Sequence, residues 1–371
     1  MLIYIIILSL FLIWTIFNSF FMPELTKQRI HHNKLVSILI PLRNEEDNVI
    51  ELIQSLKKLT YQNLEFYLLD DQSTDLTSSY IKSSILNNKR FTLLYGTELP
   101  EGWTGKVHAC KQLSKHAKGD YLLFLDADVR LNPDVIQSVI HMLEKQKGHL
   151  ITGFPRFPVH HILEKWLVPM QHFLIYFHLP LFLANYTQMS SATAAHGSFM
   201  LFERQAYFNI GGHEAIKNSL LDDVHLARIM KKQGYKVILS NITSFVTCYM
   251  YKNNKEVWEG FKKNTFIGIG RSRFFAFILI SFYFCFFIFP GFLVIYEVYN
   301  FMAKNYITIS NIFPYLLIVI QKGFVDRKNK QNVSTSFAMP LIAVSFIALL
   351  ISSMVSSIRK KGYMWKGRKY H

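Results

Sequence analysis

The first two thirds of the chain alternate short apolar runs with amphipathic stretches, and long uncharged runs occupy both ends. Each short run is bounded by polar residues, which is typical of strands that are buried on both faces. Strands that alternate with helices predict crossover connections, and therefore an α/β fold with a mostly parallel sheet. The predicted strands of this sheet are residues 36–42, 65–71, 91–95 and 121–125.

The residues after the first predicted strand are typical of the start of a helix. Asn44 is a favourable N-cap residue, and the acids Glu45, Glu46 and Asp47 suit the positive end of a helix dipole. We therefore expect this helix to begin directly behind Asn44. A second helix is expected to open at residues 73–75.

Acidic residues end two of the predicted strands. Asp70 and Asp71 close the second strand, while Asp126 and Asp128 close the fourth and are one residue apart. An open α/β sheet binds ligands outside the carboxyl ends of its strands, so these carboxylates fall at the expected ligand edge. Two hard oxygen donors suit Mg²⁺ or Mn²⁺ that is held partly by the phosphates of a substrate. For an isolated Asp-x-Asp the alternative is a solvated turn.

The uncharged run at the N-terminus, residues 2–22, is long enough to cross a bilayer. It lacks a basic leading region and an obvious cleavage site, so we interpret it as an anchor and not as a removed signal. Lys27, Arg29 and Lys34 follow it directly. The positive-inside rule then places the N-terminus outside and the chain from about residue 27 onward in the cytoplasm.

Two long uncharged runs near the C-terminus, 274–296 and 334–358, are candidate spans, and the shorter run 306–320 is the weakest candidate. If all three crossed the membrane, the basic tail would lie outside, contrary to the positive-inside rule. If the shorter run did not cross, the basic cluster at 327–330 would lie outside instead. A re-entrant last run keeps every basic cluster inside.

Two segments between the predicted sheet and the C-terminal runs suit a membrane surface. Residues 166–186 are apolar and aromatic and are broken by two prolines, so we interpret them as interfacial, with a buried helix pair as the alternative. Residues 251–273 carry basic side chains around Trp258 and Phe261 and lead into a span, which suits the headgroup region.

The formal net charge of +16 does not indicate a nucleic-acid partner, because no nucleic-acid-binding motif accompanies it. Much of the excess flanks the apolar runs, where it suits an anionic membrane surface. The three cysteines, Cys110, Cys248 and Cys285, are far apart and odd in number. They form no disulfide framework and no zinc-binding spacing, which fits a reducing compartment.

Short motifs of charged, glycine and aromatic residues follow one another along the chain. They are Pro41-Leu-Arg-Asn44-Glu45, Asp70-Asp71-Gln-Ser73-Thr74-Asp75, Gly102-Trp103-Thr-Gly105-Lys106, Asp126-Ala-Asp128, His196-Gly-Ser-Phe-Met-Leu-Phe, Gly211-Gly212-His213, Asp222-Asp223-Val-His and Trp365-Lys-Gly367-Arg368-Lys-Tyr370. Several of these motifs, in their order and rough spacing, resemble those of family 2 glycosyltransferases, which have the GT-A fold and use nucleotide-diphosphate sugars. Others resemble the membrane-lipid branch of that family, and the tail is similar to that of carotenoid-acid (diaponeurosporenoate) and hopene-associated glycosyltransferases. The resemblance covers about residues 33–270 and the tail.

The resemblance implies a donor site for a UDP-sugar. In this site Asp71 would accept hydrogen bonds from the nucleotide. Asp126 and Asp128 would hold a divalent metal, Mg²⁺ or Mn²⁺, on the diphosphate, and Lys106 would add positive charge. A helix-capping acid and a surface lysine are the structural alternatives for Asp71 and Lys106. The implied donor-binding residues are Pro41, Asn44, Glu45, Asp71, Lys106 and Asp126.

The resemblance also implies inversion of the anomeric centre, which requires a base near the attacking oxygen. It places this base at Asp223, next to Asp222, where many relatives have glutamate. Helix-terminal acids are the structural alternative. If the acceptor is an already ionised carboxylate, Asp223 would mainly orient it. The strand 198–202 would floor the acceptor pocket, and we interpret His196 and His213 as structural.

The motif Gln/Arg-x-x-Arg-Trp of polymerising relatives is absent from the sequence, so a single sugar transfer is expected. The acceptor would be a membrane lipid, with a carotenoid acid as the first hypothesis and diacylglycerol, a hopanoid or a polyprenyl phosphate as alternatives. A non-catalytic membrane protein that kept the fold is the alternative class, disfavoured by the intact Asp71, Asp126, Asp128 and Asp223. A transporter is disfavoured because the polar motifs lie outside the spans.

The expected protein is therefore a multi-pass cell-membrane enzyme whose catalytic domain faces the cytoplasm. Trp365 and Arg368 in the tail are expected to lie near the donor or the acceptor headgroup. The expected parts are an anchor at 1–22, a GT-A catalytic domain at 33–250, a basic interfacial segment at 251–273, a transmembrane or re-entrant region at 274–358 and a cytoplasmic tail at 359–371.

Overall fold

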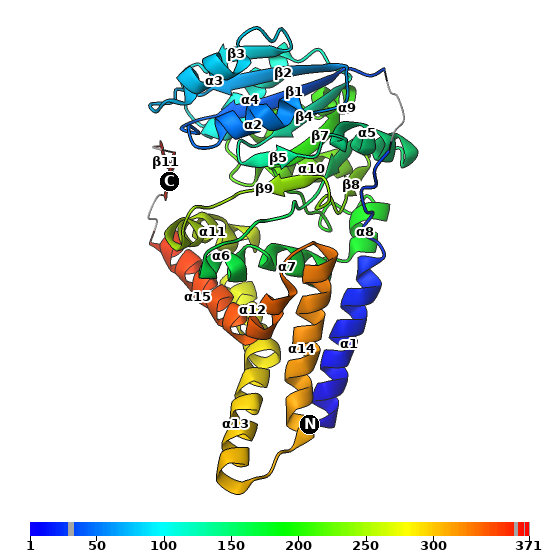
Figure 1. Ribbon diagram of the computed structural model, residues 1–371, viewed down its shortest axis with the longest axis vertical. Coiled ribbons are helices and arrows are strands. Elements are labelled where there is room, and N and C mark those ends of the chain that lie inside the picture. Colours follow the sequence, from blue (N-terminus) through cyan, green and yellow to red (C-terminus); the bar gives the residue numbers. More distant parts are fainter. Residues whose placement is uncertain (29–32, 360–362, 367, 371) are drawn as a thin grey trace. The chain divides into compact units, whose positions relative to one another are not determined.

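The structure of the protein is a computed structural model that describes all residues except 29–32, 360–362, 367 and 371. The chain divides into two compact units (Figure 1). We call them the sheet unit and the helical unit and describe each by itself. The sheet unit is formed by Phe21–Arg156 and Leu179–Tyr249, and the helical unit by Met1–Phe20, Phe157–His178 and Met250–His371.

The sheet unit is built on a seven-stranded sheet in the order β3-β2-β1-β4-β7-β6-β8. β7 runs antiparallel to both of its neighbours, and the other pairs are parallel. The predicted α/β fold is therefore confirmed, with one antiparallel strand inside the sheet. The strands are β1 (Val36–Leu42), β2 (Leu64–Asp70), β3 (Phe91–Tyr95), β4 (Tyr121–Leu125), β6 (Leu150–Thr152), β7 (Phe199–Glu203) and β8 (Val237–Leu239).

Helices flank this sheet, and a short two-stranded sheet, β5 (Val129–Leu131) with β9 (Val246–Cys248), follows β4. Two of the helices, α4 (Gly105–His116) and α10 (Asp222–Lys232), pack into one buried cluster with the strands through Leu113, Leu226 and Phe202. Burial of this apolar surface holds the N-terminal ends of both helices in place. The helices are α2 (Val49–Lys57), α3 (Thr77–Ile85), α4 (Gly105–His116), α5 (Val135–Lys145), α8 (Leu181–Tyr186), α9 (Arg204–Asn209), the short η1 (Gly212–Ile216) and α10 (Asp222–Lys232).

The expected start of the first helix is wrong. α2 begins at Val49, with Asn48 in front of it, and Asn44 lies in the loop with a positive φ of 51°. The Asn44 side chain cannot cap α2, because its Oδ1 accepts a hydrogen bond of 2.8 Å from the backbone N–H of Thr74 in a different loop. The second helix, α3, begins two residues beyond Asp75.

Three helical segments in the helical unit are long and apolar enough to cross a membrane. They are α1 (Leu2–Ser19), the segment Arg273–Lys304 and the segment Val333–Ile358, which confirms the three long runs read from the sequence. The segment Arg273–Lys304 comprises α12 (Arg273–Tyr283), the π-helical turn Phe284–Ile288 and α13 (Phe289–Lys304), and Val333–Ile358 comprises η3 (Val333–Ala338) and α15 (Met339–Ile358).

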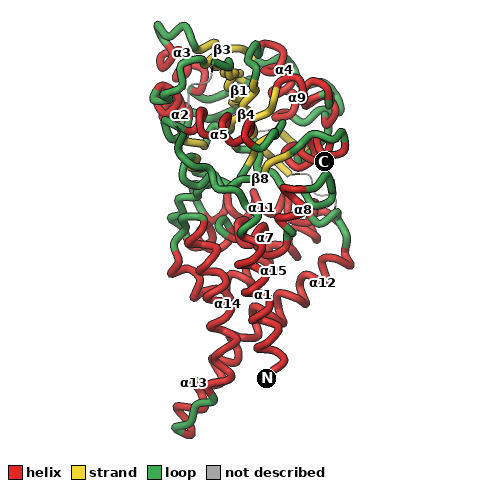
Figure 2. The backbone as a smooth tube through the Cα atoms, turned by 90° about the vertical axis from the view of Figure 1, so that its right-hand side faces the viewer, coloured by secondary structure: helices red, strands yellow, loops and turns green. Residues whose placement is uncertain are grey.

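The helical unit contains further helices besides these three segments; Figure 2 draws all helices of the protein in red. The run 306–320 becomes the first part of α14, which is not among the three candidate spans. The segment 166–186 is shared between the units, since α8 belongs to the sheet unit. The remaining helices are α6 (Ile162–Leu167), α7 (Met170–His178), α11 (Asn254–Gly268) and α14 (Ile309–Lys328).

Polar side chains inside the helical unit form hydrogen bonds or ion pairs with other groups of the same unit. Asn18 donates a hydrogen bond of 2.8 Å to the carbonyl of Tyr176, and Gln321 donates one of 2.8 Å to the hydroxyl of Thr15. Lys322 and Asp326 form a fully buried ion pair one turn apart on α14. Such pairing is required where no water can satisfy these groups.

The tail forms a small hairpin. β10 (Tyr363–Trp365) pairs antiparallel with β11 (Arg368–Tyr370), and Trp365 stands opposite Arg368 in the register. The structure describes the backbone of these strands, whereas the side chains of Trp365 and Arg368 lie outside the described part. Their expected role therefore stays a prediction.

Candidate functional site

The loops after β1 and β2 are joined by hydrogen bonds at the carboxyl edge of the sheet. The guanidinium of Arg43 donates to the carbonyls of Asp71 and Gln72, at 2.6 and 2.9 Å. The backbone N–H of Asn44 donates to the hydroxyl of Ser73 at 3.0 Å. Pro41, in β1, leads into this joined pair of loops. The motifs around Pro41 and Asp71, which are about thirty residues apart, therefore form one rigid surface.

Asp71 is a buried carboxylate on this surface. Its backbone N–H donates to the carbonyl of Leu42 at 2.7 Å. Gly96, after β3, closes the other side, since a Cβ atom at this position would lie 3.1 Å from Asp71 Oδ1. A larger residue at position 96 would therefore press on the carboxylate.

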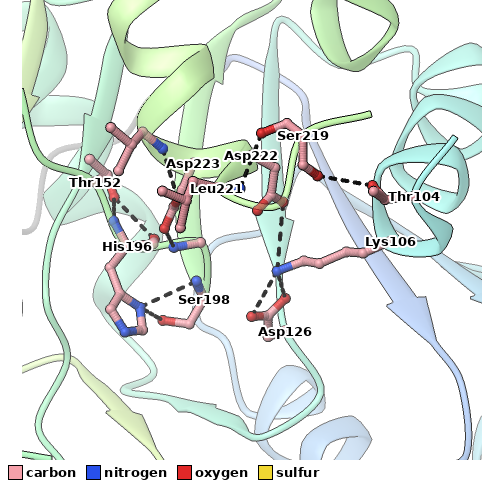
Figure 3. A network of polar contacts seen from close by, with 12 residues as sticks. Thr104, Lys106, Asp126, Thr152, His196, Ser198, Ser219, Leu221, Asp222 and Asp223 are labelled. Carbon is pink, nitrogen blue, oxygen red and sulfur yellow. Dashed lines mark hydrogen bonds and ion pairs between the residues drawn. The ribbon is translucent and has the colours of Figure 1, made fainter. Parts of the chain in front are cut away.

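Lys106, the second residue of α4, forms an ion pair with Asp126 at the end of β4. Its Nζ atom lies 2.7 Å from Asp126 Oδ1 and 3.9 Å from Asp222 Oδ2 (Figure 3). Burial alone would lower the pKa of Lys106, but the charges of Asp126 and Asp222 outweigh it and hold that pKa well above its ordinary value. The lysine therefore stays charged and joins two carboxylates from different motifs.

Asp128 follows Asp126 on the same loop, in a more apolar setting. Its Oδ1 atom is buried and has no hydrogen-bond partner among the described residues. Burial, with the nearby charges of Asp126 and Glu45, raises the pKa of Asp128 to about 7. A buried carboxylate oxygen without a donor is well suited to accept a cation.

Asp222 and Asp223 are the first two residues of α10 and have different partners. Burial would raise the pKa of Asp222, but Lys106 outweighs it and lowers that pKa below its usual value. Asp223 Oδ2 accepts a hydrogen bond of 2.9 Å from the backbone N–H of Gly197. Burial and the charge of Asp222 raise the pKa of Asp223 to about 7. Asp222 is therefore an ionised partner of Lys106, and Asp223 is poised to exchange a proton near neutral pH.

Two histidines lie close to these acids. His196 is held through its backbone by the hydroxyl of Thr152, at 3.1 and 3.2 Å, and its Nδ1 atom lies 2.7 Å from the hydroxyl of Ser198 (Figure 3). Burial lowers the pKa of His196 to about 3. His213 lies 2.8 Å from the hydroxyl of Tyr207, in the buried core. Burial lowers the pKa of His213 to about 4, so both rings are neutral at pH 7.

The structure thus brings Lys106, Asp126, Asp222 and Asp223 together, with Asp128 beside Asp126 and Asp71 on the neighbouring loops. Two residues of the site are not among those predicted from the sequence. Gly197 contributes a backbone N–H, and the thiol of Cys248 forms a hydrogen bond with Asp128. A glycine that follows a histidine does not indicate a hydrogen bond to a catalytic acid, so the residue type of Gly197 gave no signal of its role. The pairing of Val129 with Cys248 between β5 and β9 is long-range and was not predicted.

Residues 37–211 match the family described as glycosyl transferase family 2. A 4,4'-diaponeurosporenoate glycosyltransferase from Staphylococcus haemolyticus (strain JCSC1435) is 23% identical over 274 residues, which cover 72% of this chain and 70% of the relative. The enzyme of the same name from Staphylococcus aureus (strain MRSA252) is 24% identical over 352 residues, covering 91% and 89%.

Among solved structures, a mannosyltransferase from Pyrobaculum calidifontis in complex with GDP-Man and Mn²⁺ is similar to this chain with a TM-score of 0.54. The sequence identity is 16%, and the match covers 96% of this chain and 99% of the other. This likeness shows a shared GT-A fold. Residues 37–211 thus match family 2 glycosyl transferases, and the similarity to the two staphylococcal enzymes agrees with this match and supports an enzyme that transfers sugars.

Proposed function

We propose that the protein transfers one sugar, with inversion, from a UDP-sugar to a membrane lipid. One observation carries this proposal. Lys106 lies between Asp126 of the donor motif and Asp222, the neighbour of the candidate base Asp223. Groups that suit a leaving diphosphate and a group that suits the attacking acceptor are therefore in contact through one lysine.

The donor nucleotide would lie on the joined loops after β1 and β2. Asp71 would accept hydrogen bonds from the base or the ribose, as an ionised carboxylate does. Asn44 and Glu45, on the same surface, would line its edge. The Pyrobaculum mannosyltransferase binds GDP-Man, which supports the class of nucleotide sugars. The choice of UDP rests on the resemblance to the membrane-lipid branch of the family.

A divalent cation on the diphosphate would be held by Asp126 and Asp128. The Oδ1 atom of Asp128, which is buried and accepts no hydrogen bond from the part of the chain that the structure describes, supports this fit. The described residues contain no cluster of three or more histidine, cysteine or acidic side chains that could hold a metal by itself. Phosphate oxygens and water would therefore complete the coordination shell. A bound Mg²⁺ or Mn²⁺ would act as a Lewis acid and neutralise charge on the leaving diphosphate.

On the acceptor side, Asp223 would take the proton of an attacking hydroxyl, or orient an acceptor carboxylate. Its raised pKa suits a base that works near neutral pH. The Oδ2 atom of Asp223 accepts a hydrogen bond from the backbone N–H of Gly197, and its Oδ1 atom accepts one from the backbone N–H of Val224. The two bonds fix the orientation of the carboxylate. Lys106 would stay with the phosphates and balance the charge of Asp222.

The acceptor would be a membrane lipid, and a carotenoid acid is our first candidate. The three helices that could cross a membrane and the name of the staphylococcal relatives support this choice. Diacylglycerol, a hopanoid and a polyprenyl phosphate are the alternatives. The catalytic unit would face the cytoplasm, because Lys27 and Lys34 follow the first apolar helix.

The test is transfer by the purified protein in lipid nanodiscs with radiolabelled UDP-sugars and GDP-sugars, against a panel of these lipids. We expect one lipid product with a single sugar, formed from a UDP-sugar with inverted configuration. Products with several sugars would contradict single transfer, and retained configuration would contradict the role of Asp223. Nucleotide binding without turnover of any donor would favour a non-catalytic protein.

A further inference from the structure

Lys231, near the C-terminal end of α10, is a buried lysine held by backbone carbonyls. Its side chain is 2% exposed. Its Nζ atom donates to the carbonyls of Ala184 and Ala192, at 2.6 and 3.0 Å, and lies 3.5 Å from those of Leu183 and Met189. Burial lowers the pKa of Lys231 to about 8, with no carboxylate of the described chain opposing the shift. The ammonium is thus surrounded by carbonyl dipoles.

Core packing alone does not explain a lysine at this position. Burying an ammonium group without a counter-charge is unfavourable, and an apolar residue of similar size is generally tolerated at least as well in such a place. The neighbouring buried residues of α10, Leu226, Ala227 and Met230, are apolar. The carbonyls of α8 and of the loop after it therefore receive hydrogen bonds from a long cationic side chain, which an apolar residue at this position could not donate.

The loop that Lys231 holds also reaches the candidate base. We define the acceptor segment as residues 182–197, from α8 to Gly197. Gly197 is bound to Asp223, which lies eight positions before Lys231 and therefore about 12 Å away along the same helix. The acceptor segment is thus tied to α10 at two points, by Asp223 at one end of the helix and by Lys231 near the other. Without Lys231, the segment would be tied to α10 by Asp223 alone, while Asn185 and His196 would still hold it to Leu239 and Thr152.

The other end of the acceptor segment carries exposed apolar side chains. Phe182, Tyr186 and Met189 are 50%, 51% and 48% exposed. The rings of Phe182 and Tyr186 stack at a centroid distance of 5.7 Å, and each also contacts the ring of Phe21. Aromatic side chains at a surface favour the apolar body of an amphiphile. The segment therefore connects a surface suited to a lipid with the carboxylate that would receive its reactive group.

We propose that Lys231 is a positioning residue for the acceptor: it fixes the acceptor segment on α10, so that a lipid bound along the segment meets Asp223 in a productive geometry. The inference rests on the proposed function. A loss of alignment of about 1 Å between reacting groups lowers rates by on the order of 10²-fold. Lys231 touches neither the donor motifs nor Asp223 itself, so the effect is specific for the acceptor.

The first experiment compares Lys231→Met with Lys232→Met, which removes the exposed neighbouring lysine of the same helix. We expect Lys231→Met to raise the acceptor KM or lower kcat for lipid transfer by about tenfold or more, as expected for misplaced reacting groups. The donor KM and the slow hydrolysis of the donor by water should stay unchanged, and Lys232→Met should behave as the parent. Equal losses of transfer and hydrolysis, or no loss, would overturn the proposal.

A second experiment separates the missing cation from a general loss of packing. Lys231→Ala leaves a space lined by carbonyls, so ethylammonium or butylammonium in the buffer should restore lipid transfer. Tetramethylammonium has no N–H group and should not restore it, and Lys232→Ala should respond to neither. A rescue by all of these cations alike would contradict the hydrogen-bonded tie.

A third measurement does not depend on turnover and therefore distinguishes a failure of this inference from a failure of the proposed function. Amide hydrogen exchange in the parent and in Lys231→Met should differ in residues 187–195, with faster exchange in the variant. Exchange in α4, which lies outside the tie, should be unchanged. Identical exchange in 187–195 would show that Lys231 does not hold the segment, whatever the protein transfers.

Discussion

The backbone N–H of Gly197 donates a hydrogen bond of 2.9 Å to the carboxylate of Asp223. A Cβ atom at position 197 would lie 3.5 Å from Asp223 Oδ2 and 3.3 Å from Lys106 Nζ. The candidate base Asp223 and Lys106, which binds Asp126, therefore both lie against Gly197. A substitution of Asp223 should therefore affect the transfer step, and a substitution of Lys106 should affect donor binding.

Asp223→Asn should abolish base catalysis and leave donor binding intact. The amide keeps the size of the side chain and can accept one of its two backbone hydrogen bonds, from Gly197 or from Val224, but it cannot take a proton. With a hydroxyl acceptor we expect kcat to fall by on the order of 10²-fold or more. Steady-state kinetics with a titration of UDP would measure both effects, and Glu214→Gln, at an exposed acid, is the control. An unchanged kcat would mean that the acceptor is already ionised or that the base is another residue.

The pH dependence of transfer should report Asp223. Since burial and Asp222 raise the pKa of Asp223 to about 7, a base at this position is protonated below that pH. The rate with a hydroxyl acceptor should rise with pH up to about 7 and then level off, and the rise should disappear in Asp223→Asn. A rise with the same midpoint in the variant would assign the pH dependence to another group.

Stability should depend on pH with the opposite sign. An unfolded aspartate has a pKa of about 3.9, so the folded protein binds the Asp223 proton more tightly. This contribution to the free energy of unfolding is full below pH 4 or so and is lost as the pH rises through about 7. Asp223→Asn should therefore raise the melting temperature more at pH 8 than at pH 5. Equal shifts at both pH values would contradict the raised pKa of Asp223.

Lys106→Met should weaken donor binding. The substitution removes the positive charge between Asp126 and Asp222 and leaves two carboxylates facing the donor diphosphate without it. We expect the donor KM to rise by about tenfold or more, as for the loss of a charge-assisted contact. Lys115→Met, on the exposed side of the same helix, is the matched control. A normal donor KM with a lower kcat would instead place Lys106 in the transfer step.

Removal of a divalent metal should silence the enzyme. EDTA should stop transfer, Mn²⁺ or Mg²⁺ should restore it, and Asp128→Ala should abolish transfer and weaken binding of the UDP-sugar in the presence of either metal. The buried Oδ1 of Asp128 is the physical reason. Isothermal titration with a UDP-sugar, with and without metal, would measure the binding. Full activity in EDTA would exclude the metal role of Asp126 and Asp128.

Arg368→Lys in the tail should lower transfer while membrane insertion stays normal. A guanidinium can bind a diphosphate through two parallel hydrogen bonds, and a lysine cannot. Plain positive charge near the membrane is already supplied by Arg359 and its neighbours. A cysteine placed after Tyr370 tests the side of the tail, because labelling of intact cells by an impermeant reagent would place it outside and contradict the prediction.

The sequence by itself determined the main elements of the sheet unit. β1 and β4 begin and end where their apolar runs do, because a strand buried on both faces requires an unbroken run of apolar side chains. β3, at the edge of the sheet and only partly buried, also has the predicted bounds. The acids after β2 and β4 lie at the carboxyl edge because parallel strands all end there. Asp222 and Asp223 open a helix as expected, since acids stabilise its positive end.

Other features were decided only by the tertiary structure, because they depend on partners that are distant in the chain. Asn44 has the composition of an N-cap, but Thr74 takes its side-chain oxygen, so α2 begins later. The tie from Gly197 to Asp223 uses a backbone N–H, which leaves no trace in residue type. Lys231 reads in the sequence as one of two helix-terminal lysines. Only the tertiary structure brings the carbonyls of Ala184 and Ala192 to Lys231 and makes it a buried donor, since burial and carbonyl contacts are properties of the assembled fold.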